Sequence, residues 1–290
     1  MKTILVTGAT GFLGSHITRA LHAAGHRVVI IKRATSKLDR IEDIAQDIAM
    51  FNIDDDPEVV FKAMDKIDAI VHTATSYGRQ GETVSQIFEA NTAFPLRLLD
   101  VAIRFKTETF INTDTILNKY LNNYSLSKRH FMEWGRYLAD NGKLGFINIR
   151  LEHMYGPGDD SSKFTTHVIR SCMQNIPELK LTPGKQRRDF IYIDDVVAGY
   201  MRLLQIVEGA PPEFSQYDLG TGEAVTIRHF VETVHRLTGS TTTLDFGGLP
   251  YRKNEIMCSE ADVAPLRNLG WCCKTSLEDG ILKTINEEST

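Results

Sequence analysis

The chain has 290 residues, of which 42% are hydrophobic and 24% charged, and its formal net charge at pH 7 is −4. This composition fits a globular protein with a sizeable core, and the slight acidity argues against a dedicated nucleic-acid or membrane-surface protein. No sequence stretch is long and apolar enough to span a membrane, and the four cysteines show no metal-ligand spacing. We therefore expect a cytoplasmic protein with reduced thiols and no metal site.

The amino terminus predicts a strand, a glycine-rich turn and a helix. Residues 2–6 are apolar, residues 7–14 read Thr-Gly-Ala-Thr-Gly-Phe-Leu-Gly, and an amphipathic helix follows. Gly8 suits the tight turn, Gly11 the close approach of a pyrophosphate, and Gly14 the packing of helix on strand. The phosphates would bind the free N–H groups at the helix start, where the helix dipole favours an anion. An ordinary glycine-rich turn is the weaker alternative.

Residues 27–32 are predicted to form the second strand, and the end of this strand distinguishes the two nicotinamide cofactors. An acidic residue there binds the ribose 2′-hydroxyl of NAD, whereas a basic residue accommodates the 2′-phosphate of NADP. Lys32 and Arg33 occupy this position, and no acid occurs before Asp39. We therefore expect NADPH rather than NAD, with solvated surface charge as the alternative interpretation.

Strands and helices alternate through the first half of the chain. This alternation predicts an α/β fold with a doubly wound parallel sheet. After the second strand, we expect strands at residues 48–53, 68–74, 110–113 and 145–151, and helices at residues 57–64, 84–105 and 122–141.

The short strand that ends at Thr113 precedes a polar turn and a helix that carries Tyr124 and Lys128. Positions i and i+4 share one helix face, so the phenol and the ammonium can face the same space. The ammonium would favour the phenolate and lower the tyrosine pKa from its usual value of about 10, which would make Tyr124 an acid/base. Thr113 could hydrogen-bond the same reacting oxygen. Alone, such a pair is more often a solvated helix face.

The glycine pattern and the Thr…Tyr-x-x-x-Lys series together resemble the extended short-chain dehydrogenase/reductases, the family of nucleotide-sugar epimerases, dehydratases and reductases. The resemblance covers nearly the whole chain. It implies a Rossmann-like sheet for a nicotinamide dinucleotide and a smaller mixed α/β substrate-binding region toward the carboxyl terminus. The implied division is a dinucleotide-binding domain of residues 1–158 plus about 190–222 and a sugar-nucleotide-binding region of residues 159–189 plus 223–290.

In members of this family, helices that correspond to residues 84–105 and 122–141 form a dimer interface. The resemblance therefore implies a homodimer, although an apolar helical stripe is core by default. It also implies a nucleotide-sugar substrate, with no nucleic-acid or membrane partner.

The resemblance implies a role for individual residues, of which Arg188 and Arg252 would bind the substrate diphosphate through their guanidinium groups. Surface ion pairing is the alternative for both arginines. The implied catalytic residues are Thr113, Tyr124 and Lys128. The implied cofactor residues are Gly8, Thr10, Gly11, Phe12, Leu13, Gly14, Lys32, Arg33, Asn52, Ile53, Thr73, Ala74, Thr75, Asn91, Tyr124 and Lys128. The implied substrate residues are Thr113, Asp114, Tyr77, His153, Lys163, Phe164, Arg188, Arg252 and Glu255.

The sequence departs from the family pattern at positions that bear on the reaction. Asn52 replaces the usual acid near the adenine, and His153 replaces an asparagine, although both can still form hydrogen bonds. The dehydratases carry an Asp-Glu pair after the catalytic threonine. Residues 113–115 are Thr-Asp-Thr and lack the glutamate, so we do not expect dehydration. NADP is a dissociable reductant, which favours net reduction.

Within the reductases, residues 112–114, 127–131, 150–153, 155–159, 188–190 and 254–257 look like those of the CDP-abequose and CDP-paratose synthases. This resemblance implies NADPH-dependent reduction of the C4 keto group of a CDP-4-keto-3,6-dideoxyhexose during O-antigen synthesis. An NAD-dependent nucleotide-sugar epimerase remains an alternative. A non-catalytic NADP sensor is a more remote one, because such proteins generally lose the tyrosine or the lysine. The base, the deoxygenation at C3 and the configuration at C4 rest on resemblance or stay open.

Overall fold

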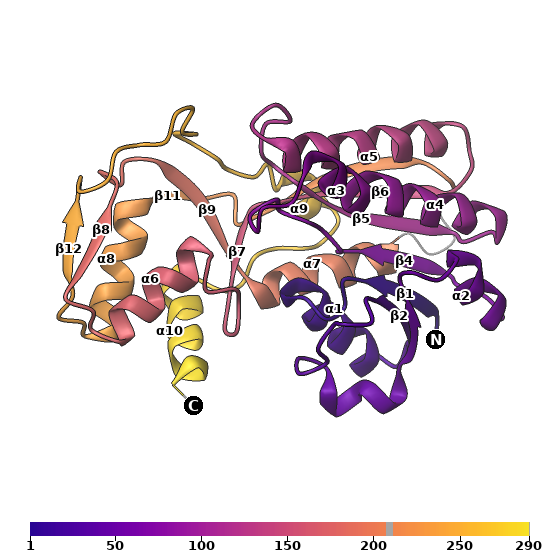
Figure 1. Ribbon diagram of the computed structural model, residues 1–290, viewed down its shortest axis with the longest axis horizontal. Helices are drawn as coiled ribbons and strands as arrows, with labels where there is room; N and C mark the ends of the chain where they lie inside the picture. The colour runs from indigo at the N-terminus through magenta and orange to yellow at the C-terminus, as the bar shows by residue number, and fades with distance from the viewer. Residues whose placement is uncertain (207–210, 290) are drawn as a thin grey trace. The chain divides into compact units, whose positions relative to one another are not determined.

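The computed structural model describes residues 1–206 and 211–289 (Figure 1). The chain forms two compact units. Unit 1 comprises Met1–Arg150 and Tyr200–Tyr217, and unit 2 comprises Leu151–Gly199 and Asp218–Thr290. The helix α7 (Ile193–Ile206) and the strand β10 (Phe214–Leu219) each begin in one unit and end in the other.

A seven-stranded sheet with the order β10-β6-β5-β4-β1-β2-β3 forms the centre of unit 1. β1 pairs in parallel with both β2 and β4, and the pairs β2–β3 and β4–β5 are parallel as well. The sheet thus winds outward in both directions from β1, which confirms the predicted doubly wound topology. Besides β10, its strands are β1 (Thr3–Thr7), β2 (Arg27–Lys32), β3 (Ala49–Asn52), β4 (Ala69–His72), β5 (Thr109–Thr115) and β6 (Gly145–Leu151).

The inner strands of this sheet are nearly continuous apolar runs because helices cover both faces. Leu5 of β1, Val29 of β2 and Ile70 of β4 are fully buried, and they pack with Leu98 and Phe131 from the covering helices. Figure 1 shows α4 and α5 along one face and α1 along the other. The helical segments are α1 (Phe12–Ala23), the 3₁₀ segment η1 (Glu42–Asp47), α2 (Pro57–Ala63), α3 (Val84–Phe88), α4 (Phe94–Arg104) and α5 (Asn123–Asp140).

The single helix predicted at residues 84–105 is interrupted. Between α3 and α4 lies a π-helical turn, η2 (Glu89–Ala93), in which the N–H of Phe94 donates to the carbonyl of Glu89. Pro95 follows directly, and it has no N–H to donate to the carbonyl four residues earlier. A wider turn accommodates this missing α-helical hydrogen bond. The interruption places Asn91 inside the turn.

Most of the other predicted elements of unit 1 are confirmed, and β2 and β6 have the predicted bounds. β5 differs because it continues to Thr115, two residues beyond the predicted end. A run of Thr-Asp-Thr after the apolar residues reads as a polar turn in the sequence. In the structure, the side chain of Asp114 lies in a hydrogen-bond network within the sheet, so the strand continues.

Unit 2 contains two small sheets and a layer of helices. In the first sheet, β9 (Arg187–Tyr192) pairs in parallel with β7 (His153–Tyr155) and antiparallel with β11 (Ala224–Thr226). In the second, β8 (Glu178–Leu181) and β12 (Thr243–Phe246) are parallel. This confirms the predicted smaller mixed region. Its helices, besides the start of α7, are α6 (Phe164–Met173), α8 (Ile227–Thr238), α9 (Ala264–Asn268) and α10 (Leu277–Glu288).

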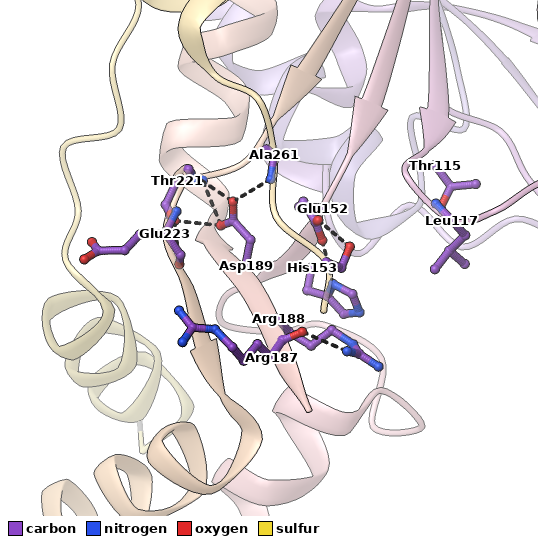
Figure 2. A network of polar contacts seen from close by, with 12 residues as sticks. Thr115, Leu117, Glu152, His153, Arg187, Arg188, Asp189, Thr221, Glu223 and Ala261 are labelled. Atoms are coloured by element: carbon purple, nitrogen blue, oxygen red, sulfur yellow. Dashed lines mark hydrogen bonds and ion pairs between the residues drawn. The ribbon is translucent and has the colours of Figure 1, made fainter. Parts of the chain in front are cut away.

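Aromatic rings pack together in the core of unit 2, and one buried carboxylate binds the backbone of its loops. The Phe190 and Phe230 rings stack with centroids 4.4 Å apart. The carboxylate of Asp189 accepts hydrogen bonds from the N–H groups of Thr221, Gly222 and Ala261 at 2.8–3.3 Å (Figure 2). Burial raises the pKa of Asp189, although these hydrogen bonds act in the opposite direction.

The bounds of the two units differ from the division implied by resemblance. Residues 151–158 belong to unit 2 because β7 lies in the same sheet as β9. Residues 190–199 and 218–222 also belong to unit 2. Within the described ranges, no helix has both the length and the apolar character that crossing a bilayer requires.

Candidate cofactor and substrate sites

The turn between β1 and α1 has no room for a side chain at Gly8 or Gly14. Gly8 has φ of +73°, and a Cβ on it would lie 2.6 Å from the amide nitrogen of Ala74. A Cβ on Gly14 would lie 2.1 Å from the carbonyl oxygen of Gly8. The residue that caps α1 is Gly11, which has no side chain to satisfy the first N–H groups of the helix. The turn therefore presents free backbone donors at the positive end of a helix dipole, as an anionic phosphate requires.

The other predicted cofactor residues of unit 1 follow the carboxyl ends of neighbouring strands. Lys32 of β2 is in register with Asn52 of β3, and the N–H of Ile53 donates to the carbonyl of Lys32 at 2.9 Å. After β4, the hydroxyl of Thr73 donates to the carbonyl of Thr7 at 2.7 Å. The residues predicted for the cofactor therefore meet at one edge of the parallel sheet. Thr10, Phe12, Leu13, Arg33, Ala74 and Thr75 belong to the same turn and strand ends.

The side-chain amide of Asn91 is hydrogen-bonded within unit 1. Its Oδ1 accepts from the N–H of Ser76 at 2.8 Å and from the hydroxyl of Thr75 at 3.1 Å. Its Nδ2 donates to the carbonyl of Ser76 at 2.8 Å and to the hydroxyl of Ser127 at 3.0 Å. These four bonds use the hydrogen-bonding capacity of the amide. Asn91 therefore braces the loop after β4 against α5 and has no capacity left for a cofactor.

Tyr124 and Lys128 lie one turn apart near the start of α5. The helix begins at a capping box, in which Oδ1 of Asn122 accepts from the N–H of Ser125 at 2.9 Å. Lys128 is only 1% exposed, and Tyr124 is half-buried. The ring of Tyr77 lies over Tyr124 with a centroid distance of 5.0 Å. The predicted substrate residue Tyr77 is thus beside the predicted proton donor.

Thr113 and Thr115 lie on the same face of β5 but have different neighbours. Thr115 acts on Tyr124 by lowering the pKa of its phenol, whereas the Thr113 hydroxyl is 2.7 Å from the hydroxyl of Tyr200. The catalytic role of Thr113 stays a prediction. The signal that could have found Thr115 is the two-residue period of a strand, since Thr113 and Thr115 share a face and only the strand end separates them.

The pKa of Tyr124 is raised well above its usual value, chiefly by burial, and Tyr77 and Asp114 act in the same direction. The hydrogen bond with Thr115 and the charge of Arg79 oppose this rise but do not overcome it. Burial also lowers the pKa of Lys128 to about 8. The predicted lowering of the tyrosine pKa by Lys128 is therefore wrong for the protein alone. Tyr124 keeps its proton at neutral pH, which is the form that can donate it.

Asp114 was predicted to contact substrate, but both of its carboxylate oxygens are engaged inside unit 1. Oδ1 accepts from the N–H of Thr115 at 2.7 Å, and Oδ2 accepts from Nδ2 of Asn148 at 3.0 Å. The side chain is 7% exposed. This geometry makes Asp114 part of the framework under Thr115.

In unit 2, the predicted substrate residues Arg188 and Glu255 pair with each other. Nη2 of Arg188 donates to Oε1 of Glu255 at 2.7 Å. Its Nη1 donates to the carbonyl of Arg187 at 2.8 Å (Figure 2). The predicted Arg252 is exposed and lies in the same turn, where its carbonyl accepts from the N–H of Glu255 at 3.1 Å. Glu255 thus contacts both predicted arginines, through the side chain of Arg188 and the backbone of Arg252.

The other predicted substrate residues of unit 2 lie on β7 and at the start of α6. Nδ1 of His153 is 2.8 Å from Oε2 of Glu152, whose other oxygen accepts from the Ser259 hydroxyl at 2.5 Å (Figure 2). Lys163 forms an ion pair with Asp159 at 3.0 Å. Phe164 follows as the first residue of α6 and is 38% exposed. Sequence motifs alone did not indicate that Glu152 orients His153.

Known proteins resemble this chain over nearly its full length. A model described as the NAD dependent epimerase/dehydratase family matches residues 4–220. A CDP-abequose synthase of Salmonella muenchen is 36% identical and aligns over 98% of this chain and 97% of its own length. One of Salmonella typhimurium is 35% identical, over 96% and 95%. A UDP-glucose-4-epimerase of Stenotrophomonas maltophila, solved with NAD and formylated UDP-arabinopyranose, has a TM-score of 0.88 at 21% identity, covering 100% of this chain and 98% of its own. This last likeness concerns the fold.

Proposed function

Because the chain belongs to the NAD dependent epimerase/dehydratase family, we propose that it reduces the C4 keto group of a nucleotide-linked 4-keto-6-deoxyhexose with NADPH. The proposed substrate is a CDP-4-keto-3,6-dideoxyhexose, and the reaction would serve the synthesis of deoxysugars such as those of an O-antigen. The observation that carries the proposal is the state of Tyr124. A protonated phenol that lies one helical turn from a buried lysine is suited to give a proton to a new alkoxide.

The glycine turn of unit 1 fits a dinucleotide, because a Cβ on Gly8 or Gly14 would collide with the backbone that closes the turn against β4 and α1. When bound there, NADPH would supply the hydride to C4 of the sugar. The chain's own residues would complete the reaction. Tyr124 would donate the proton to the C4 oxygen, Thr115 would hydrogen-bond the same oxygen, and Lys128 would contact the ribose. We therefore assign to Thr115 the role that the motif comparison gave to Thr113.

The preference for NADPH rests on Lys32 and Arg33. Lys32 is the last residue of β2 and Arg33 follows it, where the ribose 2′ position of a bound dinucleotide would lie. Two cations there stabilise a 2′-phosphate and offer no acceptor to a 2′-hydroxyl. Exchange of both residues for Asp and Ser should shift the ratio of NADPH to NADH affinity toward NADH, measured by fluorescence titration.

In unit 2, we propose that Arg188 and Arg252 bind the substrate diphosphate and that His153 hydrogen-bonds the sugar nucleotide. A guanidinium group can meet two phosphate oxygens at once. Lys163 and Phe164 extend the same proposed surface. The carboxylate of Glu255 holds Arg188 in place at 2.7 Å.

The test is NADPH oxidation with a panel of CDP-, dTDP- and GDP-linked 4-keto-6-deoxysugars, each with and without a 3-hydroxyl group. Consumption with the CDP-linked 3-deoxy member is the expected result, and product NMR would give the configuration at C4. A Tyr124→Phe variant should bind NADPH with unchanged affinity and fail to consume it. If a sugar nucleotide changes configuration with bound NAD and no added NADPH, an epimerase replaces the reductase.

A further inference from the structure

A buried network of side chains crosses three strands of unit 1. Nδ2 of Asn112 on β5 donates to Oδ1 of Asn148 on β6 at 2.8 Å. Nδ2 of Asn148 then donates to Oδ2 of Asp114 at 3.0 Å and to Oε1 of Gln216 on β10 at 3.1 Å. Asn112 and Asn148 are 0% exposed. Within this network, Asp114 carries the only ionisable group.

The charge of Asp114 is buried without a basic partner in direct contact. Among the described residues, none forms an ion pair with Asp114, and the same holds for the ammonium of Lys128. An isolated buried charge is unfavourable unless an opposite charge or hydrogen bonds compensate it. The Asp114 carboxylate lies on β5, and the Lys128 ammonium lies on α5, which packs against β5. These two opposite charges therefore compensate each other. In line with this pairing, Asp114 raises the pKa of Lys128 against the effect of burial.

Asp114 is also linked to Tyr124 through the backbone. Its Oδ1 accepts from the N–H of Thr115 at 2.7 Å, which fixes the last residue of β5. The side chain of that same Thr115 lies close enough to Tyr124 to lower the pKa of its phenol. One carboxylate, anchored by Asn148, thus sets the place of Thr115 and faces both ionisable groups of the proposed site.

We propose that Asp114 is a positioning residue whose fixed carboxylate is the counter-charge of Lys128 and holds Thr115 against Tyr124. The proposal rests on the proposed reductase function, because it concerns the proton donor of that reaction. Asp114 itself does not contact the reacting atoms.

The direction in which the pKa values of Tyr124 and Lys128 should change follows from the groups that surround them. Tyr77 and Asp114 favour the neutral phenol of Tyr124, and Arg79 and Thr115 oppose them. Near Lys128 lies His72, which burial keeps neutral by lowering its pKa well below the usual value. Loss of the Asp114 charge makes the phenol and the ammonium easier to deprotonate. Proton donation would then fail at a lower pH.

The test compares the pH dependence of turnover in the wild type and in Asp114→Asn. We expect the alkaline limb, near pH 8 in the wild type because of Lys128, to move down by about one pH unit in the variant. At pH 8 this shift lowers kcat by about fivefold, while the Kd for NADPH at pH 6 stays unchanged. The variant should fold, because Asn112, Asn148 and Gln216 can rotate their amides to accept the new donor. Asp114→Ser, which keeps an acceptor for Thr115, should show the same shift.

Asp68→Asn is the matched control. Asp68 is a half-buried aspartate of unit 1, and its carboxylate accepts from the N–H of Thr3 at 2.8 Å and pairs with Lys66. It precedes β4, whereas the proposed site lies at the carboxyl ends of the strands. Asp68→Asn should lower stability and leave the alkaline limb in place. An unshifted limb in both Asp114 variants would overturn the proposal, and so would an equal shift in the control.

A measurement without turnover separates this proposal from the proposed function. The Cζ resonance of Tyr124 in ¹³C-tyrosine-labelled protein, assigned with Tyr124→Phe, reports its ionisation directly. The midpoint should fall in Asp114→Asn and remain in Asp68→Asn. If the wild type consumed NADPH with none of the tested sugar nucleotides, the reductase assignment would fail. This titration would still decide the role of Asp114.

Discussion

Tyr124 lies between groups that act on its proton in opposite directions. Burial and the neighbouring Asp114 hold the proton on the phenol, while Thr115 and Arg79 favour its release. A reductase needs the first state, because the proton must be present when the alkoxide forms. The direction of the proposed reaction is therefore consistent with the surroundings of one hydroxyl group.

The two threonines of β5 allow a direct test of which one assists Tyr124. Thr115→Val removes the hydroxyl that we propose to hydrogen-bond the reacting oxygen and should lower kcat/KM by about 100-fold, as expected for the loss of one donor to a developing oxyanion. Thr113→Val leaves the Tyr200 hydroxyl without its partner and should cost about 1 kcal/mol of stability, with a much smaller loss of turnover. Steady-state kinetics and thermal denaturation of both variants would check this. If Thr113→Val lost more activity than Thr115→Val, Thr113 would be the threonine that assists Tyr124.

Lys128 is expected to lower the stability of the folded protein, although the proposed reaction requires it. Its pKa is about 8 in the folded protein and about 10.5 when unfolded, so the unfolded chain binds more protons between these values. Stability should therefore rise as the pH rises from 8 toward 10.5. Lys128→Met removes this titrating group, so the rise in stability between pH 8 and pH 10.5 should disappear together with turnover. Urea denaturation of the wild type and the variant at pH 7 and pH 10 would measure this, and an equal rise in the variant would contradict it.

At the scale of elements, the turn between β1 and α1 depends on the absence of side chains. Gly14→Ala places a methyl group 2.1 Å from the carbonyl oxygen of Gly8, a distance that requires the backbone to move. We expect the Kd for NADPH to rise at least about 10-fold, since the donors at the start of α1 would be displaced. Gly145→Ala is the control, because its methyl group would lie 3.3 Å from the carbonyl oxygen of Glu108. It should leave NADPH binding unchanged in a fluorescence titration.

The sequence was sufficient to predict the type and order of the elements in unit 1, because apolar runs and glycine stops alternate there without ambiguity. It was insufficient where a local signal competes with a contact made elsewhere in the fold. Thr113–Thr115 reads as a polar turn, but the partner of Asp114 is Asn148, 34 residues away. Likewise, the apolar period of residues 84–105 continues through η2, and only the missing N–H of Pro95 pointed to an interruption.

At the scale of the whole molecule, the motifs indicated where chemistry is concentrated, but not how the side chains pair. Asn91 and Asp114 lie in the predicted regions, yet their hydrogen bonds go to other protein groups. Arg188 lies on its predicted strand, but its charge is met by Glu255, 67 residues away. Pairings across such distances depend on packing, which a single sequence does not encode in a periodic pattern.

The predicted homodimer can be tested on an exposed face of α5. Trp134 and Tyr137 are 49% and 60% exposed, and with His130 and Glu133 they line a cavity of about 460 Å³. Exposed aromatic groups of this kind often mark protein interfaces. We expect Trp134→Lys to convert a dimer to a monomer in size-exclusion chromatography with light scattering. Val59→Lys, which replaces an exposed apolar residue on α2, should leave the mass unchanged. A wild type that is monomeric at all concentrations would reject the dimer.

The pairing of Arg188 with Glu255 has a consequence for selectivity. A ligand that binds this guanidinium must first displace a carboxylate held at 2.7 Å, so Glu255 would compete with any anion at the proposed diphosphate site. Inorganic phosphate or a free mononucleotide offers little beyond the exchange of one anion for another. A sugar nucleotide adds contacts along its whole length, and these can outweigh the displacement. The ion pair would thus prevent small anions in the surrounding solution from binding to Arg188.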